Sequence, residues 1–112
     1  MINLTFLGTS SMIPTKQRNP IAMLLQIDGE NILIDCGEGT QRQLQIIGVS
    51  PSKINKIFIT HWHGDHVLGL PGLLQTINSQ KKQEQLEIYG PKETKKFLSL
   101  IQKIFILQRG NV

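Results

Sequence analysis

Short apolar runs separated by turn residues predict strands in the first third of the chain. Residues 3–7 form the first such run. Residues 21–27 and 31–35 form two more, and they are joined at Asp28-Gly29, a dipeptide that favours a tight hairpin turn. The sequence therefore predicts one strand followed, after a loop, by an antiparallel hairpin.

Apolar residues recur at helical spacing in the rest of the chain, between further short strands. Gly48 stands where the end of a helix needs a left-handed residue, and Pro71 and Gly72 predict an irregular start to the second helix. The predicted elements are, in chain order, a helix at 38–47, a strand at 56–60, a helix at 67–79, a strand at 86–89 and a helix at 92–107.

Helices that connect short apolar strands favour an α/β fold in layers, with a mixed sheet. No strand is predicted after the helix at 92–107, so the last strand has no predicted neighbour on one side. We therefore expect the sheet to have an open edge, which tends to associate unless it is covered.

Composition narrows the class of protein without identifying it. The chain has 112 residues, which suits one domain or part of one, and 39% hydrophobic with 18% charged residues exclude a disordered or collagen-like chain. A single cysteine, Cys36, cannot form an internal disulfide, which favours the cytoplasm. The net charge of +4 is compatible with a polyanionic partner but equally with an ordinary basic domain.

Residues 60–66 contain the main candidate functional side chains of this sequence. All three histidines of the chain lie in six residues, in the pattern H-x-H-x-D-H directly after a predicted buried strand. Imidazole nitrogen and carboxylate oxygen are ligands that zinc prefers. A turn after the strand can aim His61 and His63 at one ion, and Asp65 and His66 at a second. Two such ions can stabilise an in-line displacement at phosphorus, and chance clustering is a poor alternative.

This motif resembles that of the metallo-β-lactamase superfamily, and further stretches resemble one branch, ribonuclease Z, which matures tRNA 3′ ends. The loop P-T-K-Q-R-N at 14–19 and the stretch D-C-G-E-G-T-Q at 35–41 are the most specific. Weaker matches are F-L-G-T-S at 6–10, the run from His66 to Leu74, and Y-G-P-K at 89–92. The resemblance implies the N-terminal half of an αββα sandwich, with a mixed sheet and helices on one face.

The resemblance also implies roles for individual residues. His61 and His63 would bind one zinc ion, and Asp65 and His66 the other, with Asp65 also acting as the general base. Asp35 would hydrogen-bond the loop that bears the ligands. Taken without the family, Asp35 is equally well explained as a plain cap at a strand end.

RNA contacts are implied for Lys16 and Arg18, whose charges suit phosphate, although a solvated loop with incidental charge is the common behaviour of such residues. Cys36 is expected to be a small buried residue rather than a nucleophile. Trp62 is expected to pack under the metal loop rather than to stack on a base. Homodimers are implied as well, with the helix at 67–79 contributing to the interface.

The chain departs from this family in length, because complete members are more than twice as long and supply further His and Asp ligands. We therefore expect residues 1–112 to be a partial domain, the N-terminal half, with the C-terminal half absent. Apolar residues of its inner faces, including Ile57, Phe58 and Ile59, are then expected to be partly without cover. Three interpretations remain. The chain is a ribonuclease Z, or part of one that acts on precursor tRNA once the missing half is supplied. Alternatively it is another hydrolase of the superfamily, or a non-catalytic fragment or interaction module.

Overall fold

A computed structural model describes residues 2–9, 21–80 and 85–105 of the chain. The loop at 14–19, with Lys16 and Arg18, lies outside these residues, as does the end of the predicted last helix at 106–107. The predictions made for these two segments therefore stay predictions.

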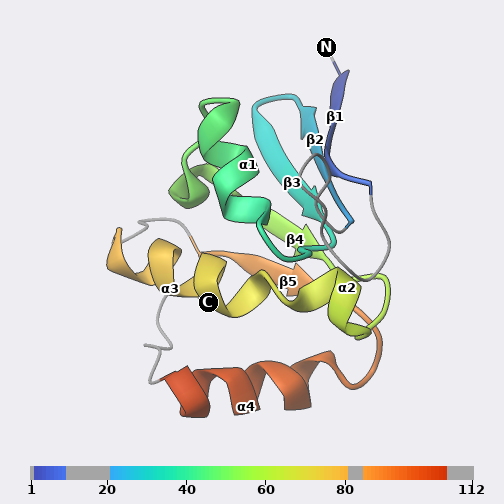
Figure 1. Ribbon diagram of the computed structural model, residues 1–112, viewed down its shortest axis with the longest axis vertical. Coiled ribbons are helices and arrows are strands. Elements are labelled where there is room, and N and C mark those ends of the chain that lie inside the picture. The colour runs from blue at the N-terminus through green and yellow to red at the C-terminus, as the bar shows by residue number, and fades with distance from the viewer. Residues whose placement is uncertain (1, 10–20, 81–84, 106–112) are drawn as a thin grey trace.

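A five-stranded mixed sheet forms the centre of the fold (Figure 1), as the sequence predicted. The strands follow one another in chain order: β1 pairs antiparallel with β2 and β2 with β3, whereas β3–β4 and β4–β5 are parallel. The strands are β1 (Ile2–Gly8), β2 (Ala22–Ile27), β3 (Glu30–Ile34), β4 (Lys56–Phe58) and β5 (Glu87–Tyr89). Because β5 pairs only with β4 in the described part of the chain, the expected edge at β5 is present.

The predicted hairpin between β2 and β3 is confirmed. Asp28 and Gly29 both have positive φ, at 50° and 80°, which matches the mirror-image turn that a two-residue hairpin requires. Glycine adopts this conformation without steric cost, and aspartate tolerates it better than most residues. The turn fixes the register in which Leu24 of β2 lies opposite Leu33 of β3.

Three helices occur where the sequence predicted them, each beginning two or three residues later, whereas the short helix at 64–67 and the 3-10 turn at 51–53 were not predicted. The helical elements are α1 (Thr40–Ile46), a 3-10 turn η1 (Pro51–Lys53), α2 (Gly64–Val67), α3 (Leu70–Ser79) and α4 (Thr94–Phe105). The helix expected at 67–79 with an irregular start is interrupted at Leu68 and Gly69, which separate α2 from α3. A Cβ atom on Gly69 would lie 2.2 Å from the carbonyl oxygen of Gly37, so only glycine allows the two segments to approach this closely.

The hydrophobic core lies between the sheet and the helices α1 and α3, which cross the same face of the sheet (Figure 1). Leu33 and Ile57, which are paired across β3 and β4, are fully buried on that face. Leu44 from α1 and Leu73 and Leu74 from α3 cover them and are also fully buried. Burial of each such side chain stabilises the fold by about 1.5–3 kcal/mol.

The opposite face of the sheet carries an apolar row that remains exposed. Residues paired from strand to strand point to the same side, and one such row crosses all five strands. This row consists of Phe6, Met23, Ile34, Phe58 and Tyr89. Phe6 is 63% exposed and Tyr89 46%. We call this set the apolar row.

The sequence prediction about uncovered apolar side chains was wrong for two of three residues. Ile57, Phe58 and Ile59 were all expected to lack cover, yet Ile57 and Ile59 are buried and only Phe58 is exposed. Successive side chains of an extended segment point to opposite faces, so Ile57 and Ile59 enter the helix-covered core when Phe58 faces outward.

None of the helices in the described ranges has the length and apolar character needed to cross a lipid bilayer.

The two faces of the sheet should respond differently to substitution. Phe6→Ser should change the free energy of unfolding by less than about 0.5 kcal/mol, because its side chain is largely exposed, and should reduce self-association. Ile57→Ala, on the covered face, should cost about 2–5 kcal/mol. Urea denaturation and sedimentation velocity measure both effects. A parent chain that stays monomeric and binds no hydrophobic dye would contradict an exposed apolar face.

Candidate metal centre

The loop that follows β4 carries the three histidines. The backbone N–H of Ile59 donates to the carbonyl of Tyr89 at 2.8 Å, so the segment stays attached to the sheet one residue beyond β4. Residues 60–63 then leave the sheet, and α2 begins at Gly64 with His63 as its N-terminal cap residue. The site thus lies at the carboxyl end of β4, where loops of parallel sheets commonly present functional groups.

His61, His63 and Asp65 come together around one point. One ligand atom from each lies within 4.8 Å of the other two. The rings of His61 and His63 meet edge to face, with centroids 4.5 Å apart. Two imidazoles and a carboxylate at this separation form a donor set that suits zinc and similar divalent ions.

His66 lies beside this trio and completes the predicted cluster. Its ring centroid is 3.8 Å from that of His61. Its Nδ1 lies 2.7 Å from Oδ2 of Asp35, and its Nε2 lies 3.3 Å from Oδ2 of Asp65. When Nδ1–H donates to Asp35, Nε2 presents a lone pair toward the Asp65 carboxylate. In the neutral ring this contact brings two acceptors together and is favourable when a metal ion lies between them, which fits a metal-binding role.

Asp65 lies close to both predicted pairs of ligands. One of its oxygens is within 4.8 Å of ligand atoms of His61 and His63, and its Oδ2 lies 3.3 Å from Nε2 of His66. A carboxylate has two oxygens and can serve both neighbours. All four predicted ligands are therefore close together, and their assignment to individual ions stays a prediction.

Asp35 is the hydrogen-bonding centre beneath the histidines. It is 3% exposed and has a positive φ of 61°, a conformation that aspartate tolerates better than bulky residues. Its Oδ1 accepts from the backbone N–H of Thr60 at 2.8 Å, and its Oδ2 accepts from the Thr60 hydroxyl at 2.8 Å. Together with the bond to His66, these contacts fix the start and the end of the histidine loop to the end of β3.

Sequence reasoning missed Thr60 as a member of this site. Its hydroxyl lies 3.1 Å from Nδ1 of His61 and 3.3 Å from Nδ1 of His66, in addition to its bonds to Asp35. A hydroxyl both donates and accepts, so Thr60 can donate to Asp35 while accepting from an imidazole N–H. Its position directly before the first histidine was the available signal.

Backbone bonds hold the segment after β3 against α2. The N–H of Cys36 donates to the carbonyl of His66 at 2.7 Å, and the N–H of Gly69 donates to the carbonyl of Cys36 at 3.0 Å. The Cys36 side chain is fully buried, and this burial raises the pKa of its thiol to about 12. The thiol therefore stays protonated at neutral pH, in agreement with its expected role as a packing residue.

Trp62 packs under the loop, as the sequence predicted. Its indole N–H donates to the hydroxyl of Thr94 at 2.9 Å, and its ring lies 5.2 Å, centroid to centroid, from that of Phe97. Both partners belong to α4, so Trp62 links the histidine loop to the last described helix.

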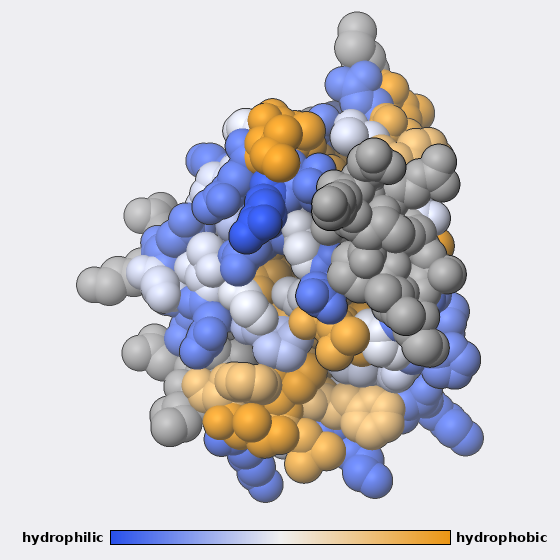
Figure 2. Space-filling view, viewed as in Figure 1, coloured by the Kyte–Doolittle hydropathy of each residue, from blue (hydrophilic) through white to orange (hydrophobic). Residues whose placement is uncertain are grey.

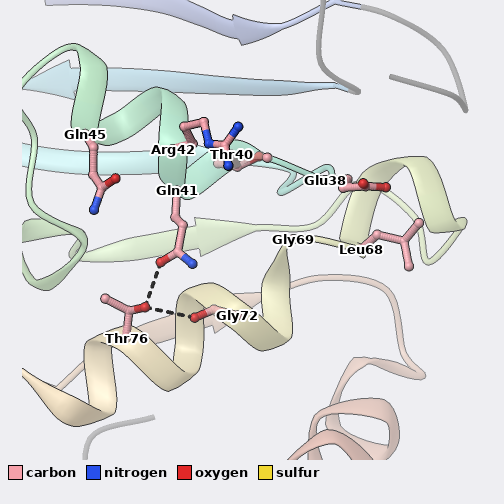
Figure 3. A pocket seen from close by; sticks show the side chains of 10 residues that line it. Glu38, Thr40, Gln41, Arg42, Gln45, Leu68, Gly69, Gly72 and Thr76 are labelled. Carbon is pink, nitrogen blue, oxygen red and sulfur yellow. Dashed lines mark hydrogen bonds between the residues drawn. The ribbon is translucent and has the colours of Figure 1, made fainter. Parts of the chain in front are cut away.

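A separate groove of about 580 Å³ lies between α1 and α3, lined in part by Glu38, Arg42 and Leu68 (Figure 3). Across it, the hydroxyl of Thr76 donates to the side-chain oxygen of Gln41 at 2.7 Å. None of the four predicted metal ligands lines this groove. It is therefore distinct from the histidine cluster.

Comparisons with known proteins bear on both the fold and the site. A family model described as "Anti-Pycsar protein Apyc1" matches residues 2–103. The chain is 55% identical over 91 residues to ribonuclease Z of Methanothermobacter thermautotrophicus, which covers 81% of this chain but 30% of that protein. The chain thus spans about a third of the length of the curated relatives it matches.

Two solved structures resemble the fold. The short form of human tRNase Z is 44% identical with a TM-score of 0.86, covering 96% of this chain and 40% of that one. A metallo-beta-lactamase fold protein from Bacillus subtilis, YhfI, is 25% identical with a TM-score of 0.76, covering 89% of this chain and 41% of that one. The predicted resemblance to ribonuclease Z and the predicted metallo-β-lactamase fold are both confirmed, and the fold implies metal binding.

Metal affinity should depend on Asp35 as well as on the ligands. His63→Ala should abolish zinc binding, since it removes one donor of the trio. Asp35→Asn keeps a residue that tolerates positive φ but removes the charge that orients His66, so zinc affinity should fall about 10–100-fold. Asp28→Asn, at the other positive-φ aspartate, is the matched control and should leave affinity unchanged. Titration calorimetry that finds the two Asp→Asn variants indistinguishable would contradict this role.

Proposed function

The chain belongs to the family described as Anti-Pycsar protein Apyc1, and we propose that it is the N-terminal part of a metal-dependent endoribonuclease of the ribonuclease Z type. The complete enzyme would remove the 3′ trailer of precursor tRNA. The observation that carries this proposal is the cluster of His61, His63, Asp65 and His66 above Asp35, in a chain 55% identical to a ribonuclease Z over 91 residues.

The metal is proposed to be zinc, with two ions in a complete site. His61 and His63 would hold one ion, and His66 the other, with Asp65 as the carboxylate ligand of the second. Four ligands shared by two ions leave two for each, whereas a catalytic zinc usually has three protein ligands and a water. The residues of this chain therefore supply two of the three protein ligands that each ion needs.

Bound zinc would supply a water that is readily deprotonated and would neutralise charge on the phosphodiester. Asp65 would accept a proton from such a water; in support, its carboxylate lies 3.3 Å from Nε2 of His66 and within 4.8 Å of ligand atoms of His61 and His63. Asp35 would keep the Nδ1 proton of His66 directed away from the site, which leaves Nε2 as its ligand atom. A residue that protonates the leaving oxygen would come from outside this chain, since all three histidines are already used.

The apolar row supports the proposal that the sandwich is incomplete. A sheet that packs against a second sheet presents alternate residues to it, and the row crosses all five strands in register. The missing half, from a longer chain or a second polypeptide, would cover Phe6, Phe58 and Tyr89. The same half would bring the further metal ligands, so that folding and assembly of the site would be coupled.

The proposed partners are precursor tRNA and a second copy of the chain. Lys16 and Arg18 are proposed to contact RNA phosphates. A homodimer is proposed to use the region of α1 and α3, since Ile46 and Ile47 at the end of α1 and Leu68 beside the groove are exposed. A cytoplasmic location is also part of the proposal.

A second candidate is a hydrolase that acts on a phosphodiester other than precursor tRNA. The description of the matching family model, an anti-Pycsar protein, favours it, because that name does not refer to tRNA. The same half-site would serve both reactions, since the metal cluster determines the chemistry and not the substrate.

Cleavage assays separate these functions. The 112-residue chain alone should not cut precursor tRNA. A chimera with the C-terminal part of the Methanothermobacter ribonuclease Z, beyond the matched region, should cut it after the discriminator base, and Asp65→Ala should reduce the rate by at least about 100-fold. Asp28→Asn, which keeps a residue that tolerates positive φ on an exposed turn, is the control.

Two results would contradict the proposal. Zinc-dependent cleavage by the short chain alone, lost in Asp65→Ala, would show that the site is complete without a second half. A folded, zinc-loaded chimera that hydrolyses bis(p-nitrophenyl) phosphate but not precursor tRNA would favour the second candidate.

A further inference from the structure

The polar side of α4 is strongly basic. Lys95, Lys96 and Lys103 are exposed on this helix, and Lys92 is exposed in the turn before it. At 100° per residue, the three helical lysines fall within one arc of about 100°, on the side away from the apolar residues. They extend over about 12 Å of the helix axis. We call these four residues the lysine face.

The positive charge of the lysine face is not neutralised within the described part of the chain. None of the four lysines forms an ion pair with a described carboxylate. Glu93 is the only acidic residue between 92 and 105, and it is partly buried. A run of like charges without partners favours a polyanionic ligand, because it raises the local potential.

The apolar side of α4 packs in part against the rest of the protein, while Leu100, Ile104 and Phe105 remain exposed. Leu98 and Ile101 contact the core cluster, and Phe97 contacts Trp62. This packing turns the lysine face outward; Figure 2 shows hydrophilic side chains projecting below the apolar area over α4. The lysines are therefore presented to solvent by a fixed helix and not by a loop.

The same packing connects the lysine face to the metal loop. Trp62 lies between His61 and His63, and its indole N–H bonds to Thr94, the first residue of α4. Lys92, Lys95 and Lys96 are within two residues of Thr94 in sequence. The basic surface therefore begins next to the proposed cleavage site and extends away from it along the helix.

We propose that the lysine face of α4 binds the phosphate backbone of the RNA substrate, and that Trp62 and Thr94 fix its position relative to the metal loop. This inference rests on the proposed function and adds a binding surface to it. Lysine suits this task as a point charge that contacts phosphate without reading sequence. Such contacts position a substrate and give an affinity that falls steeply with salt.

An anionic membrane is the alternative partner for a basic amphipathic helix. The contacts of α4 favour RNA, because a helix that lies on a bilayer must direct its apolar side to the lipid. Here Phe97, Leu98 and Ile101 of that side are occupied by Trp62 and the core, and only Leu100, Ile104 and Phe105 are left exposed.

The test compares two double variants that each remove two positive charges. Lys95→Gln/Lys96→Gln alters the lysine face. Lys53→Gln/Lys56→Gln alters residues on η1 and β4, outside the proposed dimer region, and is the matched control. Fluorescence anisotropy with labelled precursor tRNA, in EDTA and at 50–300 mM KCl, measures the affinity of the parent and of each variant for the RNA without cleavage.

The α4 variant should bind precursor tRNA about tenfold more weakly near 100 mM salt. In a plot of the logarithm of the association constant against the logarithm of the salt concentration, its slope should be shallower by about 2. The control should retain the parent slope.

Equal losses of affinity in both variants, or an unchanged affinity of the α4 variant, would overturn the inference. Loss of binding to phosphatidylserine vesicles with unchanged tRNA binding would assign the surface to membranes instead. Cleavage by the chimera together with normal tRNA binding by the α4 variant would reject this inference alone, leaving the proposed function intact.

Discussion

The buried carboxylate of Asp35 is the interaction on which the site depends. It lies at the end of β3 and accepts hydrogen bonds from the backbone and side chain of Thr60 and from His66. Thr60 precedes the histidine loop and His66 lies in α2 after it, so one side chain holds both ends of a loop that is distant in sequence. A buried carboxylate is costly unless its oxygens are paired, and here both oxygens are.

This arrangement explains how the candidate metal ligands can be ordered in a chain that spans about a third of the length of its relatives. The histidine loop is positioned by β3, β4 and α2, all of which belong to this chain, and Trp62 adds an anchor on α4. The apolar row, in contrast, is not covered by elements of the described chain. Its residues face a side of the sheet where they remain exposed, and a sheet of this kind is ordinarily covered on both faces. The candidate metal ligands are therefore well supported, whereas one face of the sheet is left partly uncovered.

The sequence predicted those features that depend on local pattern. The hairpin at Asp28-Gly29, the helix that precedes Gly48 and the clustering of the histidines were all visible because each involves residues close in sequence. The order and the mixed character of the sheet followed from the alternation of strands and helices.

Contacts between distant segments were not predictable in the same way. The break before α3 depends on the approach of Gly69 to Gly37, and the anchor of the loop depends on Thr94, 32 residues after Trp62. Thr60 was missed because its importance comes from Asp35, 25 residues earlier in the chain. The error about Ile57 and Ile59 arose because a continuous apolar run hides which side of the strand each residue faces.

Amide hydrogen exchange at Thr60 tests the central claim most directly. Thr60 is exposed and lies beyond the end of β4, so its amide has one reason for protection, the bond to Oδ1 of Asp35. The account predicts that this amide is protected in the parent chain and loses protection in Asp35→Gly, which allows positive φ but has no carboxylate. The neighbouring amide of Ile59, bonded to Tyr89, should stay protected in both. A Thr60 amide that exchanges as freely in the parent chain as in Asp35→Gly would contradict the account.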